Sequence, residues 1–185
     1  GLAYITSGGD AVMITVPGFF DLGSASFLGL TLPVWTMLAC FVIFGVILNM
    51  TAFGRNVLAT GGNSEAAALA GVNVRRLKII VFGLQGVVAG IVGVLLASRM
   101  GLGGPNTSMG LELAVISACV LGGVALSGGV ATITGVVVGV LIMGCVQNAM
   151  GLLNVPTFYQ YLVRGGILLL AVMFDRWKHT RRQRA

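Results

Sequence analysis

Long stretches without a single charge dominate this sequence and restrict the folds it can adopt. Uncharged segments of 33, 20 and 51 residues separate Asp21 from Arg55, Lys78 from Arg99, and Glu112 from Arg164. A soluble domain carries about 25% charged residues on its surface, whereas this chain has 9% charged and 57% hydrophobic residues. Both a soluble globular domain and a disordered chain are excluded, and the sequence predicts an integral membrane protein.

Helix-breaking residues divide the apolar stretches into membrane helices, each of which needs about 20 residues to cross the hydrocarbon core. Pro33 precedes an apolar run to Met50, the first predicted span, and residues 79–98 form the second. The third stretch is too long for one span. Its breaks predict a short helix over 113–126, a full span over 130–148 and a last span over 158–174, with Gly122, Gly123, Gly128, Gly129, Asn148, Asn154 and Pro156 as breakers. We therefore predict an all-α, polytopic membrane helical bundle with about five membrane helices, one of them short or broken.

The basic residues set the orientation of these spans. Nine of the eleven lysines and arginines lie in residues 51–78 and 175–185, which the positive-inside rule places in the cytoplasm. Residues 99–112 are then external, and an odd number of crossings must follow. The short helix at 113–126 therefore crosses or partly crosses the membrane, which is tolerated only inside protein or along a cavity.

Three regions follow from this topology. Residues 1–30 are only mildly apolar, and we expect the end of a span that begins before this sequence, followed by external or interfacial structure. Residues 31–174 form the membrane domain, with a cytoplasmic loop at 51–78. Residues 175–185 form a basic cytoplasmic tail.

Several kinds of chemistry are absent from the sequence. Neither Lys78 nor Lys178 follows a glycine, so no Walker A loop is present, and the single histidine, His179, excludes zinc-protease motifs and a Ser-His-Asp triad within the membrane. The three cysteines lie in apolar runs without metal-ligand spacing. We expect no catalytic, metal or cofactor site on this chain, so that energy comes from a partner or an ion gradient.

Glycines recur at helical spacing on two spans. Small residues at such spacing permit close helix contact, within a bundle or across a dimer. The candidate packing positions are Gly83, Gly86, Gly90 and Gly93 on the second span, and Gly135 and Gly139 on the later one. The alternative is the ordinary glycine content of a membrane protein.

The cytoplasmic loop contains the signals of a short helix. Asn63 or Ser64 can cap its start, and Glu65 complements the helix dipole. Helix-forming alanines follow, and Gly71 suits the left-handed position after the last turn. We predict a helix of about two turns with small side chains. It either docks in a groove of another protein or serves as a capped connector.

Several motifs of the chain resemble one family of permeases. Glu65-Ala66-Ala67 followed by Gly71 resembles the EAA loop of bacterial ABC importer permeases. The ribose/xylose/arabinose branch is similar around Phe53-Gly54-Arg55, Gly62-Asn63, residues 115–123, Ser127-Gly128-Gly129 and residues 148–154. Residues 97–100 and 116–123 are most similar to the L-arabinose members of this branch. The resemblance covers nearly the whole chain and implies roughly the C-terminal half of a permease.

This resemblance implies a function and a set of partners. The protein would be the transmembrane subunit of an ATP-driven importer for a pentose such as L-arabinose, in the bacterial inner membrane. Its partners would be an ATP-binding cassette subunit, which carries ATP and Mg²⁺, a periplasmic sugar-binding protein, a second permease copy and membrane lipid. The ATPase-coupling residues would be Gly54, Arg55, Asn63, Glu65, Ala66, Ala67 and Gly71. The alternatives are another monosaccharide such as ribose, xylose or galactose, branched-chain amino acids, or an ion-coupled secondary transporter.

Polar residues near broken helices are candidates for a translocation path, because a sugar needs neutral donors and acceptors. They are Glu112, Ser117, Gly122, Gly123, Ser127, Gln147, Asn148 and Asn154. Hydrogen bonding between helices is an equally good explanation for the neutral members. For Glu112, an acid favoured by the helix dipole, or one paired with Arg99, is the simpler interpretation.

Overall fold

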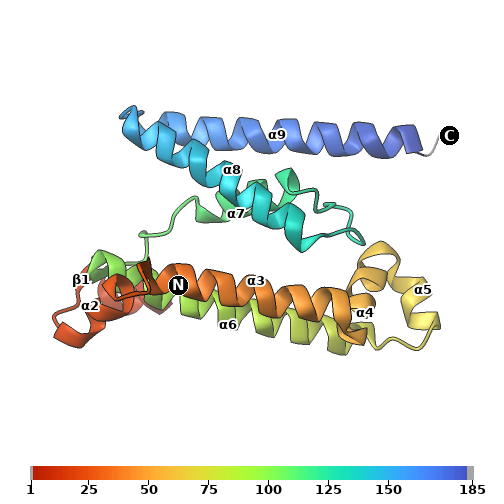
Figure 1. Cartoon of the computed structure of the whole chain (residues 1–185), viewed down its shortest axis with the longest axis horizontal. Helices are drawn as coiled ribbons and strands as arrows, with labels where there is room; N and C mark the ends of the chain where they lie inside the picture. The colour runs from red at the N-terminus through yellow and green to blue at the C-terminus, as the bar shows by residue number, and fades with distance from the viewer. Residues whose placement is uncertain (1, 183–185) are drawn as a thin grey trace. The chain divides into compact units, whose positions relative to one another are not determined.

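A computed structural model describes the backbone of residues 2–182 and the side chains of residues 4–173 except Thr6 and Pro17. Helices make up most of this part of the chain (Figure 1). They are α1 (Leu2–Ser7), α2 (Pro17–Ser24), α3 (Leu32–Met50), α4 (Ala52–Gly62), α5 (Ser64–Leu69), α6 (Val74–Met100), α7 (Leu111–Leu121), α8 (Ile133–Leu152) and α9 (Thr157–Arg182). Two antiparallel pairs of two-residue strands are added, β1 (Val12–Met13) with β4 (Leu102–Gly103) and β2 (Ser26–Phe27) with β3 (Leu30–Thr31).

The prediction of a polytopic helical membrane protein is confirmed. Within the described residues, α3, α6 and α8 are long and apolar enough to cross a membrane. The shorter apolar helices are α7 and residues Thr157–Met173 of α9. The chain forms two compact units, one of residues 2–46 and 73–109, and the other of residues 47–72 and 110–182.

In the first unit, α6 is the longest helix and its two ends are capped. The Asn73 side chain accepts a hydrogen bond from the Arg76 amide at 3.0 Å, and Gly101 ends the helix with a left-handed φ of 69°. The helix starts before the predicted span at residue 79, because Arg75, Arg76 and Lys78 are good helix formers and Asn73 supplies the cap.

The segment before α3 gathers at the C-terminal end of α6. The Ser98 hydroxyl, fully buried, donates to the carbonyl of Phe19 at 2.5 Å. A Cβ at Gly23 would lie 2.7 Å from the Arg99 amide nitrogen, so that α2 lies directly on the α6 backbone. The β1–β4 pair adds a second link to the residues that follow α6. Residues 2–31 are thus attached to the end of α6 that the charge pattern predicts to be external.

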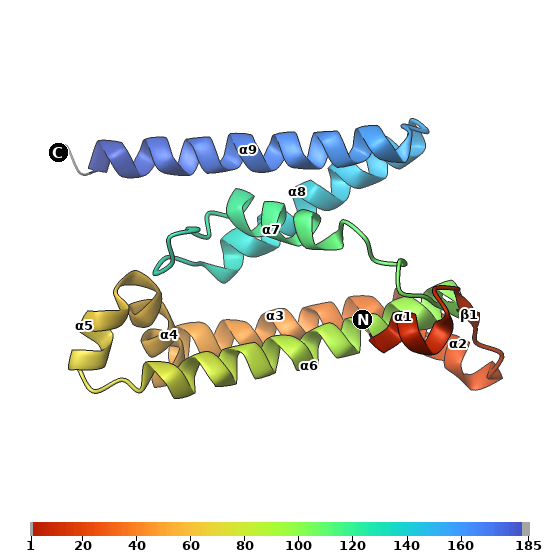
Figure 2. The same ribbon diagram turned by 180° about the vertical axis from the view of Figure 1, so that it is seen from behind.

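In the second unit, α7 packs against both α8 and α9, which Figure 2 shows from the side of α7. The two helices α7 and α8 run antiparallel with backbone against backbone. A Cβ at Gly139 would overlap the carbonyl oxygen of Ala118, and one at Gly122 would lie 2.5 Å from the Gly135 carbonyl oxygen. The absence of side chains at these glycines is what allows α7 and α8 to approach so closely.

Three helix boundaries in this unit differ from the predicted ones. Helix α7 ends at Leu121, not at 126, because Gly123 adopts a left-handed φ of 81°. Asn148 lies inside α8, and the break falls at Asn154, which has a φ of 50°. Helix α9 continues to Arg182, since no glycine or proline follows Gly166 to stop it. The side chains of the predicted tail, 175–185, lie outside the described residues.

The contact of Gly139 with Ala118 gives a direct test of this packing. We expect Gly139→Ala to lower the stability of the purified protein by about 1–3 kcal/mol, because the new methyl group overpacks the α7–α8 contact. Gly144→Ala is the matched control on the same helix, since a Cβ there meets nothing within 4 Å. Thermal unfolding in detergent measures both, and equal melting temperatures would contradict the packing.

Candidate functional site

A tight corner connects α3 to α4, the start of the segment that the charge pattern predicts to be cytoplasmic. The Thr51 hydroxyl donates to the carbonyl of Ile47 at 2.5 Å and accepts from the Gly54 amide at 3.2 Å. Gly54 is buried, and a Cβ there would overlap the carbonyl oxygens of Ile47 and Leu48. Gly54 is thus structural, whereas the next residue, Arg55, is exposed.

Asn63 joins α4 to α5 without a linker. Its side-chain oxygen accepts from the amides of Glu65 and Ala66, both at 3.0 Å. Its own amide donates to the carbonyl of Ala59, so the same residue ends α4 and begins α5. The predicted two-turn helix is therefore present, with Asn63 as its cap. The preceding helix α4 was not predicted.

Most side chains of α5 are exposed. Ala67 is buried, while Glu65 and Ala66 are exposed and Leu69 is 91% exposed. Gly71 follows with a φ of 88°, the left-handed conformation expected of a helix stop. An exposed leucine beside a carboxylate on a capped helix is a suitable surface for another protein.

A contact that the sequence did not predict links α4 to the loop after α7. A Cβ at Gly61 would lie 2.7 Å from the Gly129 amide nitrogen, and one at Gly128 would overlap the Gly61 carbonyl. A Cβ at Gly129 would lie 2.7 Å from the Gly62 Cα. We call these four residues, Gly61, Gly62, Gly128 and Gly129, the glycine junction. The two double glycines are visible in the sequence, but nothing there indicates that they meet.

The candidate path residues divide between the two ends of the α7–α8 pair. Gly122, Gly123 and Ser127 lie at the end beside the glycine junction. In the antiparallel α7–α8 pair, Gly139 lies against Ala118. Four residues further along each helix, Ala114 is level with Met143, and both are buried. The same register places Glu112, at the start of α7, level with Cys145, so that Gln147 and Asn148 follow at the same end of α8. Asn154, just beyond α8, is also at this end.

The structure describes the surroundings of two of these candidates, Ser117 and Glu112. Ser117 is fully buried, but its hydroxyl donates to the Leu113 carbonyl of its own helix at 2.7 Å. Its hydroxyl hydrogen is therefore used within α7, and a role of Ser117 in the path stays a prediction. Glu112 is exposed in the first turn of α7, where the helix dipole favours an acid, and its pairing with Arg99 stays a prediction.

Arg164 lies at the same end of the α7–α8 pair as Glu112, and sequence analysis did not include it among the candidate path residues. Arg164 is the eighth residue of α9, and its Nε is buried with no hydrogen-bond partner among the described residues. Its guanidinium lies over the Tyr161 ring, 5.7 Å from the centroid. The Tyr161 ring also packs on Gly110, just before α7. Ionisable residues within membrane helices are often functional. A single arginine inside an apolar stretch is the sequence signal that could have identified Arg164.

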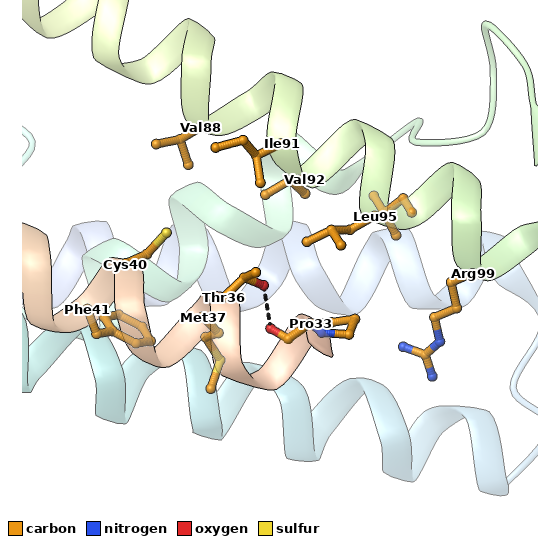
Figure 3. A pocket seen from close by; sticks show the side chains of 11 residues that line it. Pro33, Thr36, Met37, Cys40, Phe41, Val88, Ile91, Val92, Leu95 and Arg99 are labelled. Atoms are coloured by element: carbon orange, nitrogen blue, oxygen red, sulfur yellow. Dashed lines mark hydrogen bonds between the residues drawn. The ribbon is translucent and has the colours of Figure 1, made fainter. Parts of the chain in front are cut away.

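The first unit contains a groove of a different character, between α3 and α6 (Figure 3). It has a volume of about 320 Å³, and its walls are apolar side chains such as Phe41, Ile91 and Leu95. Thr36 bonds to the Pro33 carbonyl at 2.8 Å, and Arg99 stands at one end (Figure 3). None of the predicted path residues lines it. Apolar walls do not suit a ligand rich in hydroxyl groups.

The glycine row on α6 is open in this structure. A Cβ added at Gly83, Gly86, Gly90 or Gly93 would meet nothing within 4 Å. Among the described residues of its own unit the row therefore makes no close contact, in contrast to Gly135 and Gly139 in the second unit. Contact with another chain remains a prediction.

Comparison with known proteins places this chain among transport permeases. The family described as branched-chain amino acid transport system, permease component, matches residues 3–172. The chain belongs to this family.

Sugar permeases are among its relatives. The chain is 68% identical over 99% of its length to an L-arabinose ABC transporter permease protein of Azospirillum brasilense, covering 54% of that protein. It is 61% identical over 96% to the L-arabinose transport system permease protein of Escherichia coli, also covering 54%. A ribose import permease protein of Bacillus subtilis is 41% identical over 96%, with 56% covered. The chain spans about half the length of these curated relatives, and no solved structure matches it.

The cap of α5 can be tested separately from transport. We expect Asn63→Ala to weaken α5 by about 1 kcal/mol, because the amides of Glu65 and Ala66 lose their acceptor. Hydrogen exchange at residues 65–70 should then become about fivefold faster. Asn63→Asp retains a capping oxygen and serves as the control. Unchanged exchange in Asn63→Ala would show that α5 does not depend on this cap.

Proposed function

We propose that this chain is part of the transmembrane subunit of an ATP-driven sugar importer, with L-arabinose as substrate. The observation that carries the proposal is the 68% identity over 99% of the chain to an L-arabinose permease protein. The identity to xylose and ribose permease proteins is lower, at 49% and 41%. Another pentose is therefore the second candidate, and branched-chain amino acids, named in the family description, the third.

In this proposal the chain itself performs no bond chemistry. ATP would be bound and hydrolysed, with Mg²⁺, on an ATP-binding cassette subunit, and a periplasmic binding protein would deliver the sugar. The helix α5 would dock on the ATPase subunit through its exposed face, which includes Glu65 and Leu69. This arrangement is supported by the capped, protruding geometry of α5 and by the cytoplasmic position that the nearby basic residues predict.

The translocation path would involve the α7–α8–α9 group. Its polar end combines Glu112, Gln147 and Asn148 with Arg164 and the Tyr161 ring, a set of donors, acceptors and an aromatic face suited to a hydroxyl-rich ring. The other candidate positions, Gly122, Gly123, Ser127 and Asn154, would let the backbone approach or turn near the two ends of the path.

The protein would function as a homodimer in the bacterial inner membrane. The open glycine row of α6 supports contact with a second copy, since small residues favour close helix association. The many exposed apolar side chains of α3, α6 and α8 would contact lipid acyl chains or further helices of the complete permease.

Uptake into proteoliposomes tests the substrate and the energy source together. The complete permease, reconstituted with its ATPase subunit and binding protein, should take up L-arabinose in preference to ribose and xylose, and only with ATP. Uptake that persists without the ATPase subunit, or that follows a proton or sodium gradient, would point instead to a secondary transporter.

The coupling role of α5 predicts a loss of transport without a loss of membrane insertion. Glu65→Arg reverses the exposed charge, and Gly71→Leu places a side chain at a φ of 88°. We expect each change to lower uptake by about tenfold or more and to weaken co-purification of the ATPase subunit. Gly71→Asn is the control, because asparagine tolerates the left-handed conformation. Normal uptake with both changes would show that the loop is a connector.

A further inference from the structure

We propose that the glycine junction passes movement of α5 to the α7–α8 pair. The proposal rests on the proposed function, in which α5 docks on an ATPase subunit, and it assigns a role to four residues outside the predicted coupling set. It follows from an unbroken series of contacts within one unit of the structure.

The first link is the rigid corner between α4 and α5. Asn63 donates its amide to α4 and accepts two amides of α5 with its side chain. The carbonyl of Asn63 also accepts from the Ala67 amide at 3.1 Å. With four hydrogen bonds at one residue and no intervening linker, a displacement of α5 must displace Gly61 and Gly62 at the end of α4.

The second link is the junction itself, where main chain meets main chain. The Gly61 backbone lies against the backbones of Gly128 and Gly129, and Gly62 lies against Gly129. No flexible side chain stands between them to absorb a displacement. Closely packed backbone deforms little, so a push on one side is transmitted to the other.

The third link is the order of the loop that carries Gly128 and Gly129. The Ala125 amide donates to the Val130 carbonyl, and the Gly128 amide donates to the Ala125 carbonyl, both at 3.0 Å. Ala125 is buried, and the Val124 amide is bonded to the Cys119 carbonyl of α7. The loop is therefore fixed to the end of α7, which meets the start of α8 at Gly122 and Gly135.

The chain leaves the far end of α5 through Gly71, which is exposed and whose Cβ would meet nothing within 4 Å. The Gly54 corner packs the start of α4 on the end of α3. The packed route from α5 to α7 and α8 therefore runs through the glycine junction, and so reaches the helices that the proposed function places along the path.

Neighbouring glycines provide a matched pair of variants. A Cβ at Gly61 would lie 2.7 Å from a backbone atom of Gly129, whereas a Cβ at Gly62 would lie 3.7 Å from the Gly129 Cα, an ordinary contact. Both glycines are in α4. Gly61→Ala should lower the sugar taken up per ATP hydrolysed by about tenfold, while Gly62→Ala should remain within about twofold of wild type. Equal effects of the two changes would overturn the proposal.

A distance measurement covers the case in which Gly61→Ala fails to assemble. Spin labels are placed singly at Ala59→Cys on α4, which Asn63 fixes to α5 and which lies outside the proposed docking face, and at Val138→Cys on α8. Both positions are exposed, and Cys40, Cys119 and Cys145 are first replaced by alanine. In the complete transporter, trapping with ATP and vanadate should shift the distance between the two copies at both positions. A shift at Ala59 without one at Val138 would overturn the proposal.

The two measurements also separate this proposal from the proposed function. Failure of the wild-type transporter to take up any sugar would reject the importer assignment. Normal wild-type uptake with no difference between Gly61→Ala and Gly62→Ala would reject only the role of the junction. So would normal uptake with no change in the distance measured at Val138 on α8.

Discussion

Helices in a bilayer gain little by burying apolar side chains against one another, because lipid tails are as apolar as leucine. Their association depends on close approach, and in this protein glycine makes that approach possible. Gly135 and Gly139 allow the backbone of α8 to approach α7. The glycine junction allows the end of α4 to approach the loop between α7 and α8. At Gly139, Gly135 and Gly61 a side chain larger than hydrogen would displace these contacts, which help to hold the second unit together.

The same constraint explains why polar features lie where they do. A membrane helix must satisfy its own backbone groups, so the breaks in the long apolar stretch fall at left-handed residues such as Gly123 and Asn154. Two buried hydroxyls bond to carbonyls, that of Ser117 within α7 and that of Ser98 across to α2. The Thr60 hydroxyl and the Nε of Arg164 are buried without a partner among the described residues, and Arg164 stands at the polar end of the proposed path.

In the proposed function, energy from a partner ATPase would enter this chain through α5. The capped helix α5 offers an exposed surface, and Asn63 fixes it to α4. The glycine junction then connects α4 to the helices that carry most of the candidate path residues. Glycine in this protein serves as a helix stop at Gly71, as a corner at Gly54 and as a contact at Gly61, and only the surroundings distinguish these roles.

The sequence alone determined the class of the fold, the approximate spans and the short capped helix, because charge spacing, apolar length and capping residues act locally. It also identified the family, since its motifs are short and continuous. The exact ends of α7 and α8 depended on which glycine or asparagine turned left-handed. Only the tertiary structure decided that Gly61 meets Gly129, that Ser117 bonds within its own helix, and that Gly83 to Gly93 stay open while Gly139 is packed. These outcomes depend on which backbones approach one another in space, and identical glycine spacing in the sequence does not encode that approach.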